Sequence, residues 1–321
     1  MFINHKIFPS CATIVALIFT ACDAGVSSTE VTIPDEPSAA IQAIADEMLV
    51  GNCSILWLAM PPSYQADIND IAQLAGAKVD PEIYDNSFGI FGRLVKVADK
   101  QKSFILNTKL GGEKPAERIA KIEAAWPSII GFVQTIATSS ISSSAGLRDF
   151  DGQVFAEQTL PILFKYANDL LQLNLFTRLI YLVDPYQAYL PLLKIDSFKT
   201  VEITDTTAVL EATFVNGEVD YVDFTKVENH WVLAEIASNW STDMSDAKKQ
   251  LEAISSEEMV KNKPQIMGMI TMVDGILTQL EKAETQEQFD QALQGAMMPI
   301  GLLMMQSMGE GIGAPEMPVV P

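Results

Sequence analysis

The sequence is poor in positive charge, histidine and cysteine. It has 21 lysines and arginines against 41 aspartates and glutamates, a formal net charge of -20, two histidines and three cysteines. Such a chain repels nucleic-acid phosphates and anionic lipid surfaces, so we expect no nucleic-acid partner. Cysteines and histidines with the spacing of a zinc site are also missing, and we predict no bound metal and no cofactor.

The motifs of the common enzyme classes are absent as well. The chain has no phosphate-binding loop, no nucleophile elbow and no dinucleotide fingerprint. We therefore identify no catalytic residue, and the sequence favours a protein that is not an enzyme. An enzyme whose catalytic groups meet only in the fold stays open.

The start of the chain has the pattern of a secretory leader. Lys6 precedes an apolar run that ends at Phe19 and is far shorter than the about 20 residues that cross a bilayer. Two small residues separate this run from Cys22. We expect residues 1–21 to be a signal peptide that is removed. The alternative is a retained signal anchor in which the cysteine is incidental.

The segment Phe19-Thr20-Ala21-Cys22 resembles the lipobox of bacterial lipoproteins, with Phe19 where that motif usually has leucine. The resemblance implies that Cys22 is the lipid-attachment residue and that the leader is cut before it. More than one acyl chain makes such an anchor stable. Asp23 resembles the signal that retains enterobacterial lipoproteins in the inner membrane. The implied location is a bacterial cell membrane, with the protein facing the periplasm; the outer membrane stays open.

The remaining cysteine chemistry is limited. Cleavage before Cys22 removes Cys11 and leaves Cys53 alone with the lipid site, so we expect no disulfide within the mature chain. Cys53 lies in the apolar segment NCSILWLAM, where we predict a buried side chain instead of a nucleophile.

Hydrophobic residues make up 48% of the chain, enough for a buried core. The pattern predicts an α+β, mainly helical fold. Helix starts are indicated by Ser63 and Asp80 as caps. We divide the chain into a flexible tether at residues 22–36, an N-terminal helical domain at 37–140 and an α+β meander domain at 149–240. A C-terminal helical hairpin at 243–308 and a disordered tail at 309–321 follow.

The meander domain contains β-branched and aromatic residues that alternate with polar ones. Asn216-Gly217 predicts a type I′ hairpin turn, and Glu228-Asn229 predicts the following turn. These turns delimit four antiparallel strands, at about 198–204, 207–215, 218–227 and 230–236.

A helical segment followed by such a meander, which closes on the strand KVENHWVL, resembles the cystatin-like fold of the nuclear-transport-factor-two-like superfamily. The resemblance implies a pocket between the helix and the curved sheet. We expect Trp231, His230 and Asp223 to line it. This superfamily includes enzymes and binding modules, so the fold alone assigns no function.

The predicted hairpin is rich in methionine near its end, at positions 297, 298, 304, 305 and 308. Methionine side chains adapt to many partners, so we predict a protein contact surface there. Taken together, the sequence favours a lipid-anchored envelope protein of binding or adaptor type with an unknown partner. The alternatives are an envelope hydrolase or isomerase with a pocket in the meander domain, and a structural protein whose hairpin pairs with itself.

Overall fold

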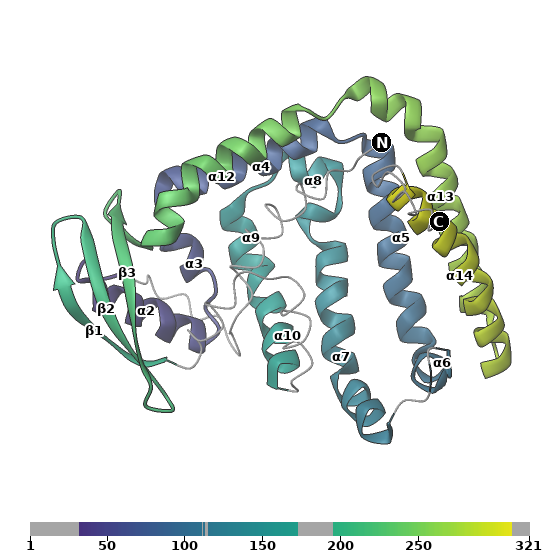
Figure 1. Ribbon diagram of the computed structural model, residues 1–321, viewed down its shortest axis with the longest axis horizontal. Coiled ribbons are helices and arrows are strands. Elements are labelled where there is room, and N and C mark those ends of the chain that lie inside the picture. The colour runs from purple at the N-terminus through teal and green to yellow at the C-terminus, as the bar shows by residue number, and fades with distance from the viewer. Residues whose placement is uncertain (1–31, 111, 113–114, 173–194, 310–321) are drawn as a thin grey trace, which may run out of the picture.

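The computed structural model describes residues 32–110, 112, 115–172 and 195–309. Within these ranges, twelve α-helices and one four-stranded antiparallel sheet form an α+β, mainly helical fold, which confirms the predicted class. The sheet lies at one end of the molecule (Figure 1). No helix of the described part is both long and apolar enough to cross a membrane. The leader, Cys22, Asp23 and the predicted tail beyond residue 309 lie outside the described residues.

The helices precede and follow the sheet in the chain. Those before it are α2 (Pro37–Leu49), α3 (Ile55–Leu58), α4 (Pro62–Lys78), α5 (Pro81–Lys100), α6 (Lys102–Asn107), α7 (Ala116–Thr138), α8 (Ser144–Arg148), α9 (Gly152–Gln158) and α10 (Leu160–Gln172). Those after it are α12 (Ala234–Glu252), α13 (Ser256–Lys282) and α14 (Gln286–Gly309).

The sheet is a meander in the order β1-β2-β3-β4, formed by Ile195–Ile203, Thr207–Phe214, Val219–Val227 and His230–Leu233. All four predicted strands are present. The last is shorter than predicted, because the chain enters α12 at Ala234. Leu210, Phe224 and Trp231 are buried on one face of the sheet, where they pack with Ala40 of α2. Alternation along the strands therefore creates one buried face.

The two hairpin turns differ from each other in backbone conformation. The predicted type I′ turn at Asn216-Gly217 is wrong, because only Gly217 has a positive φ, of 83°. The Gly217 N–H donates to the Phe214 carbonyl, so the loop has one residue more than a two-residue turn. Glu228 and Asn229 instead have φ values of 48° and 65°, as a type I′ turn requires.

The segment before α2 is fixed to the sheet. The Trp231 indole N–H donates to the Asp35 carbonyl at 2.8 Å, and Lys226 pairs with the Asp35 carboxylate at 2.5 Å. The Glu36 carboxylate caps α2 by accepting from the Ala39 N–H. The packed residues 33–36 shorten the segment for which a tether is predicted.

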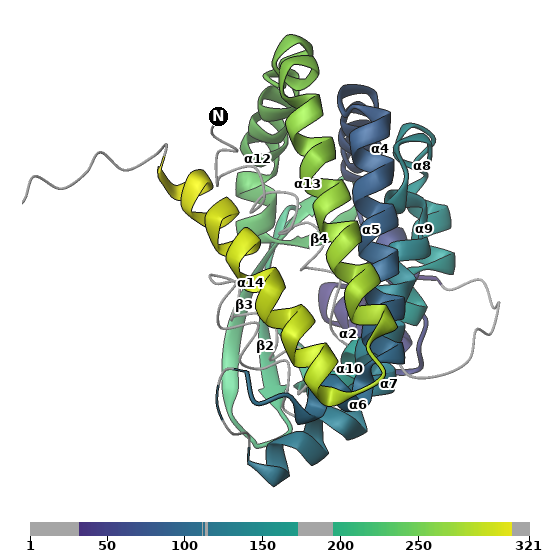
Figure 2. The ribbon, with the colours of Figure 1, turned by 90° about the vertical axis from the view of Figure 1, so that its right-hand side faces the viewer.

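The expected domains share contacts. Helix α2 packs on β1, β2 and β4, whereas α4 contacts α8, α9 and α12. At the other end of the molecule, α13 lies beside α5, and α14 returns across α13 as the predicted hairpin (Figure 2). The domain boundaries stay a prediction, because elements of each expected domain pack against another.

Several polar contacts join α13 to α5 and its cap residue. Arg93 pairs with Asp274 and with Glu281, the latter at 3.1 Å. Lys263 pairs with Asp80 at 2.9 Å, and the Asp80 carboxylate also accepts from the Ile83 N–H, which confirms Asp80 as the cap of α5. These contacts position the C-terminal hairpin on the rest of the protein.

A close helix contact generates the first prediction. A Cβ built on Gly76 of α4 would lie 2.5 Å from the Arg148 backbone nitrogen in α8, whereas one on Gly89 of α5 would meet nothing within 4 Å. We expect Gly76→Ala to destabilise the fold by about 1–3 kcal/mol, because α8 must move away. Gly89→Ala should stabilise it by roughly 0.5–1 kcal/mol through helix propensity. Urea unfolding measures both, and equal effects would contradict this packing.

The second prediction concerns pH. The Lys263 hydrogen bond and then the Ile83 N–H hold the pKa of Asp80 below its ordinary value of 3.8. A carboxyl group whose pKa is lowered in the folded state stabilises the fold at pH values above its ordinary pKa. This stabilisation is lost as the pH falls through the lowered pKa of the folded state. Lys263→Met should therefore lower the thermal midpoint more at pH 7 than at pH 3. The exposed Lys261→Met is the control, and a pH-independent difference would refute the coupling.

Candidate functional site

The structure separates the residues expected to line a pocket in the meander. Trp231 is buried on the face that α2 covers, with 8% of its surface exposed. Asp223 and His230 lie on the opposite face, because Phe224 pairs with Leu233 on the buried one. His230 pairs with Val227, four residues from Asp223, which is about 13 Å along the strand. The structure does not bring these three side chains together.

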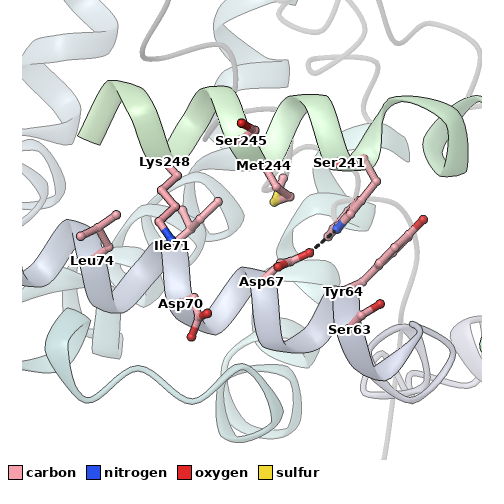
Figure 3. A pocket seen from close by; sticks show the side chains of 11 residues that line it. Ser63, Tyr64, Asp67, Asp70, Ile71, Leu74, Ser241, Met244, Ser245 and Lys248 are labelled. Atoms are coloured by element: carbon pink, nitrogen blue, oxygen red, sulfur yellow. Dashed lines mark hydrogen bonds between the residues drawn. The ribbon is translucent and has the colours of Figure 1, made fainter. Parts of the chain in front are cut away.

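A groove of about 650 Å³ lies between α4 and α12. Its lining combines an aromatic pair at one end, an aliphatic floor, three serines and three charged residues (Figure 3). The aromatic residues are Tyr64 and Trp240, and the charged ones are Asp67, Asp70 and Lys248.

The groove exists because two amphipathic helices run side by side in the same direction. Tyr64 stacks on Trp240 with ring centroids 3.9 Å apart and planes 7° from parallel. Seven residues further along each helix, Ile71 packs with Ala247, and Leu251 lies beside them. Residues seven apart lie on the same side of a helix, so both contacts form along one seam.

Asp67 positions the aromatic pair. Its carboxylate accepts a hydrogen bond of 2.8 Å from the Trp240 indole N–H across the groove (Figure 3). Tyr64 is buried, with 7% of its surface exposed. Burial, and then the charges of Asp67 and Glu228, raise the pKa of the Tyr64 phenol. The phenol therefore keeps its proton at neutral pH.

The sheet contributes to this end of the groove through Glu228. The prediction that Ser63 caps α4 is wrong: α4 begins at Pro62, and no side chain of its own cap residue closes the helix start. The Ser63 N–H instead donates to the Glu228 carboxylate at 3.0 Å. A carboxylate is favourable at a helix N-terminus. The left-handed turn at Glu228 thus brings a negative charge from the sheet to the start of α4.

Lys248 is the one cation among the described residues that line the groove. It is exposed and forms no hydrogen bond or ion pair with another residue in the described part of the chain. Figure 3 shows its side chain crossing from α12 towards Ile71 on α4. Asp70, one turn from Asp67, is exposed. The groove is therefore acidic at its aromatic end and carries an amine further along.

The remaining sequence-predicted groups lie elsewhere. Cys53 is fully buried beside Trp57 and Phe164, as predicted, and it is disulfide-bonded. The structure is that of the full 321 residues, so the expectation of no disulfide within the mature chain stays a prediction. In the methionine-rich segment, Met297 is 61% exposed, and the side chains from 298 onwards lie outside those described. Among the described residues, no group of three acidic, histidine or cysteine side chains could hold a metal.

Sequence reasoning missed the groove because each of its walls reads as an ordinary amphipathic helix. The available signal was the matching pattern of Tyr64, Ile71 and Leu74 with Trp240, Met244 and Ala247. Such a pattern predicts that each helix has a partner, but it does not identify that partner.

The third prediction tests the positioning of Trp240. Asp67→Ala leaves the indole N–H without its acceptor, and we expect a loss of about 1–2 kcal/mol in the free energy of unfolding. Asp70→Ala is a matched control on the same helix and should change stability by less than about 0.5 kcal/mol. Urea unfolding compares the two, and similar values would show that the hydrogen bond contributes nothing.

Comparison with known proteins gives no assignment. No protein-family model matches the chain. No curated protein and no solved structure matches it either. The chemistry of the groove is consequently the basis on which a function can be argued.

Proposed function

We propose that this protein is a lipid-anchored component of the bacterial cell envelope that binds a ligand or partner in the groove between α4 and α12. The observation that carries this proposal is the groove itself. Its volume of about 650 Å³ lies in the range of ligand sites, and its apolar floor with a few placed polar groups is typical of them.

The side chains of the groove support binding more than catalysis. None of the residues that line it is a histidine or a cysteine. Asp67 is engaged with the Trp240 indole, and Tyr64 keeps its proton, so neither is a poised general base. The alternative, an envelope hydrolase or isomerase at the meander, depends on Asp223 and His230, which lie about 13 Å apart along the sheet.

The anchor in this proposal is a lipid on Cys22, with Asp23 favouring the inner membrane, and the protein faces the periplasm. Its support is the lipobox-like order of residues before Cys22. The acidic chain does not itself favour an anionic lipid surface, so the lipid supplies the membrane affinity. The methionine-rich end of α14 stays a second predicted contact surface for a protein partner.

Mass spectrometry of the protein from membranes of its native host tests the anchor. We expect a diacylglyceryl group on Cys22, no residues before it, and release of the protein from the membrane fraction on Cys22→Ala. Recovery of a disulfide between Cys53 and Cys22 would overturn the lipid anchor.

Site-specific photocrosslinking in the same host tests the groove. A photoreactive residue replaces Ser245, which lines the groove, or Thr242, which is exposed on the same helix outside it. We expect a discrete crosslinked species from position 245 and none from position 242. Equal labelling from both positions, or none from position 245, would count against the groove as the binding site.

A further inference from the structure

We infer that the groove binds a short peptide in extended form by its two charged ends, with the N-terminal ammonium beside Tyr64 and Asp67 and the C-terminal carboxylate at Lys248. This inference rests on the proposed function, because it names the ligand class of the same groove. It follows from the charges at the two ends of the groove, the distance between them and the apolar floor.

The aromatic end of the groove carries the negative charge that a cation requires. Asp67 lines this end, and the Glu228 carboxylate lies at the start of α4, where it accepts from the Ser63 N–H. Burial, and then the charges of these two carboxylates, raise the pKa of the Tyr64 phenol. Among the residues that the structure describes, no lysine or arginine lines this end of the groove. A ligand ammonium placed here gains attraction from two carboxylates.

The other end of the groove carries the positive charge of Lys248, which an anion can bind. Lys248 lines the groove with its side chain directed across towards α4 (Figure 3), and it forms no ion pair with the described residues. It lies eight residues after Trp240 on one continuous helix, which corresponds to about 12 Å. A ligand carboxylate at this point would pair with the Lys248 amine, away from the carboxylates at the aromatic end of the groove.

The separation of the two ends selects the length of the ligand. Three residues in extended conformation span about 10 Å, which matches the separation once the flexible lysine is included. A single amino acid is too short to reach both ends. Between them lie Ile71 and Met244, so the middle of the peptide meets an apolar floor (Figure 3). A simple acyl chain would use this floor but neither charge.

Calorimetric titration of the full-length protein in detergent with trileucine tests the inference. We expect binding by the peptide with free ends, and at least about tenfold weaker binding after either N-acetylation or C-amidation, since each removes one charge pair. No binding by the free peptide, or equal binding of the free and blocked forms, would overturn the inference.

Three variants assign each peptide end to its side chain. Lys248→Met should weaken binding about tenfold and abolish the effect of amidation, while the effect of acetylation remains. Asp67→Asn retains an acceptor for Trp240 and should reduce the effect of acetylation alone. Asp243→Asn, which is exposed on α12 outside the groove, should leave both effects unchanged. If Lys248→Met weakens the acid and amide forms equally, the proposed orientation is wrong.

Failure of the inference can be separated from failure of the proposed function. If position 245 captures a discrete species in the host and trileucine does not bind, the groove is a binding site for another class of ligand. If position 245 captures nothing and trileucine does not bind, both proposals fail.

Discussion

The stacking of Tyr64 on Trp240 is the contact on which the arrangement of the molecule depends. Helix α12 leaves the sheet directly after β4, and this contact holds its first turns against α4. Because α12 then continues along α4, the following helix α13 starts within reach of α5. One aromatic contact, held by the Asp67 hydrogen bond, therefore links the sheet to the helices at the far end.

The same contact explains why a groove persists between two helices that could otherwise close together. A stacked pair of large rings separates the helices at one end, whereas the small side chain of Ala247 allows close packing near Ile71. The space between them keeps polar and charged groups at its edge and aliphatic groups on its floor. A groove of this composition supports recognition of a ligand that is itself apolar in the middle and charged at its ends.

Local signals predicted much of the fold but misjudged some boundaries. The Asp80 cap and the four strands were predicted because their signals act within a few residues. Ser63 failed as a cap because Glu228, which is 165 residues away, occupies that role. Asn216-Gly217 failed as a type I′ turn because its loop contains one more residue, while the less typical Glu228-Asn229 adopts that conformation. The contact of Glu228 with Ser63 offers a tertiary reason for this choice, since a left-handed residue costs energy that other interactions must offset.

By itself, the sequence determined the α+β class, the meander, the C-terminal hairpin and the acidic character of the protein, because periodicity, turn residues and charge are local properties. Only the tertiary structure decided which helices meet, and so where the groove lies. The amphipathic pattern of α4 and α12 indicates that each helix packs against a partner. Burial of apolar surface is non-directional, so the pattern does not identify that partner. The placement of Asp67, Glu228 and Lys248 around one groove is for that reason a property of the fold.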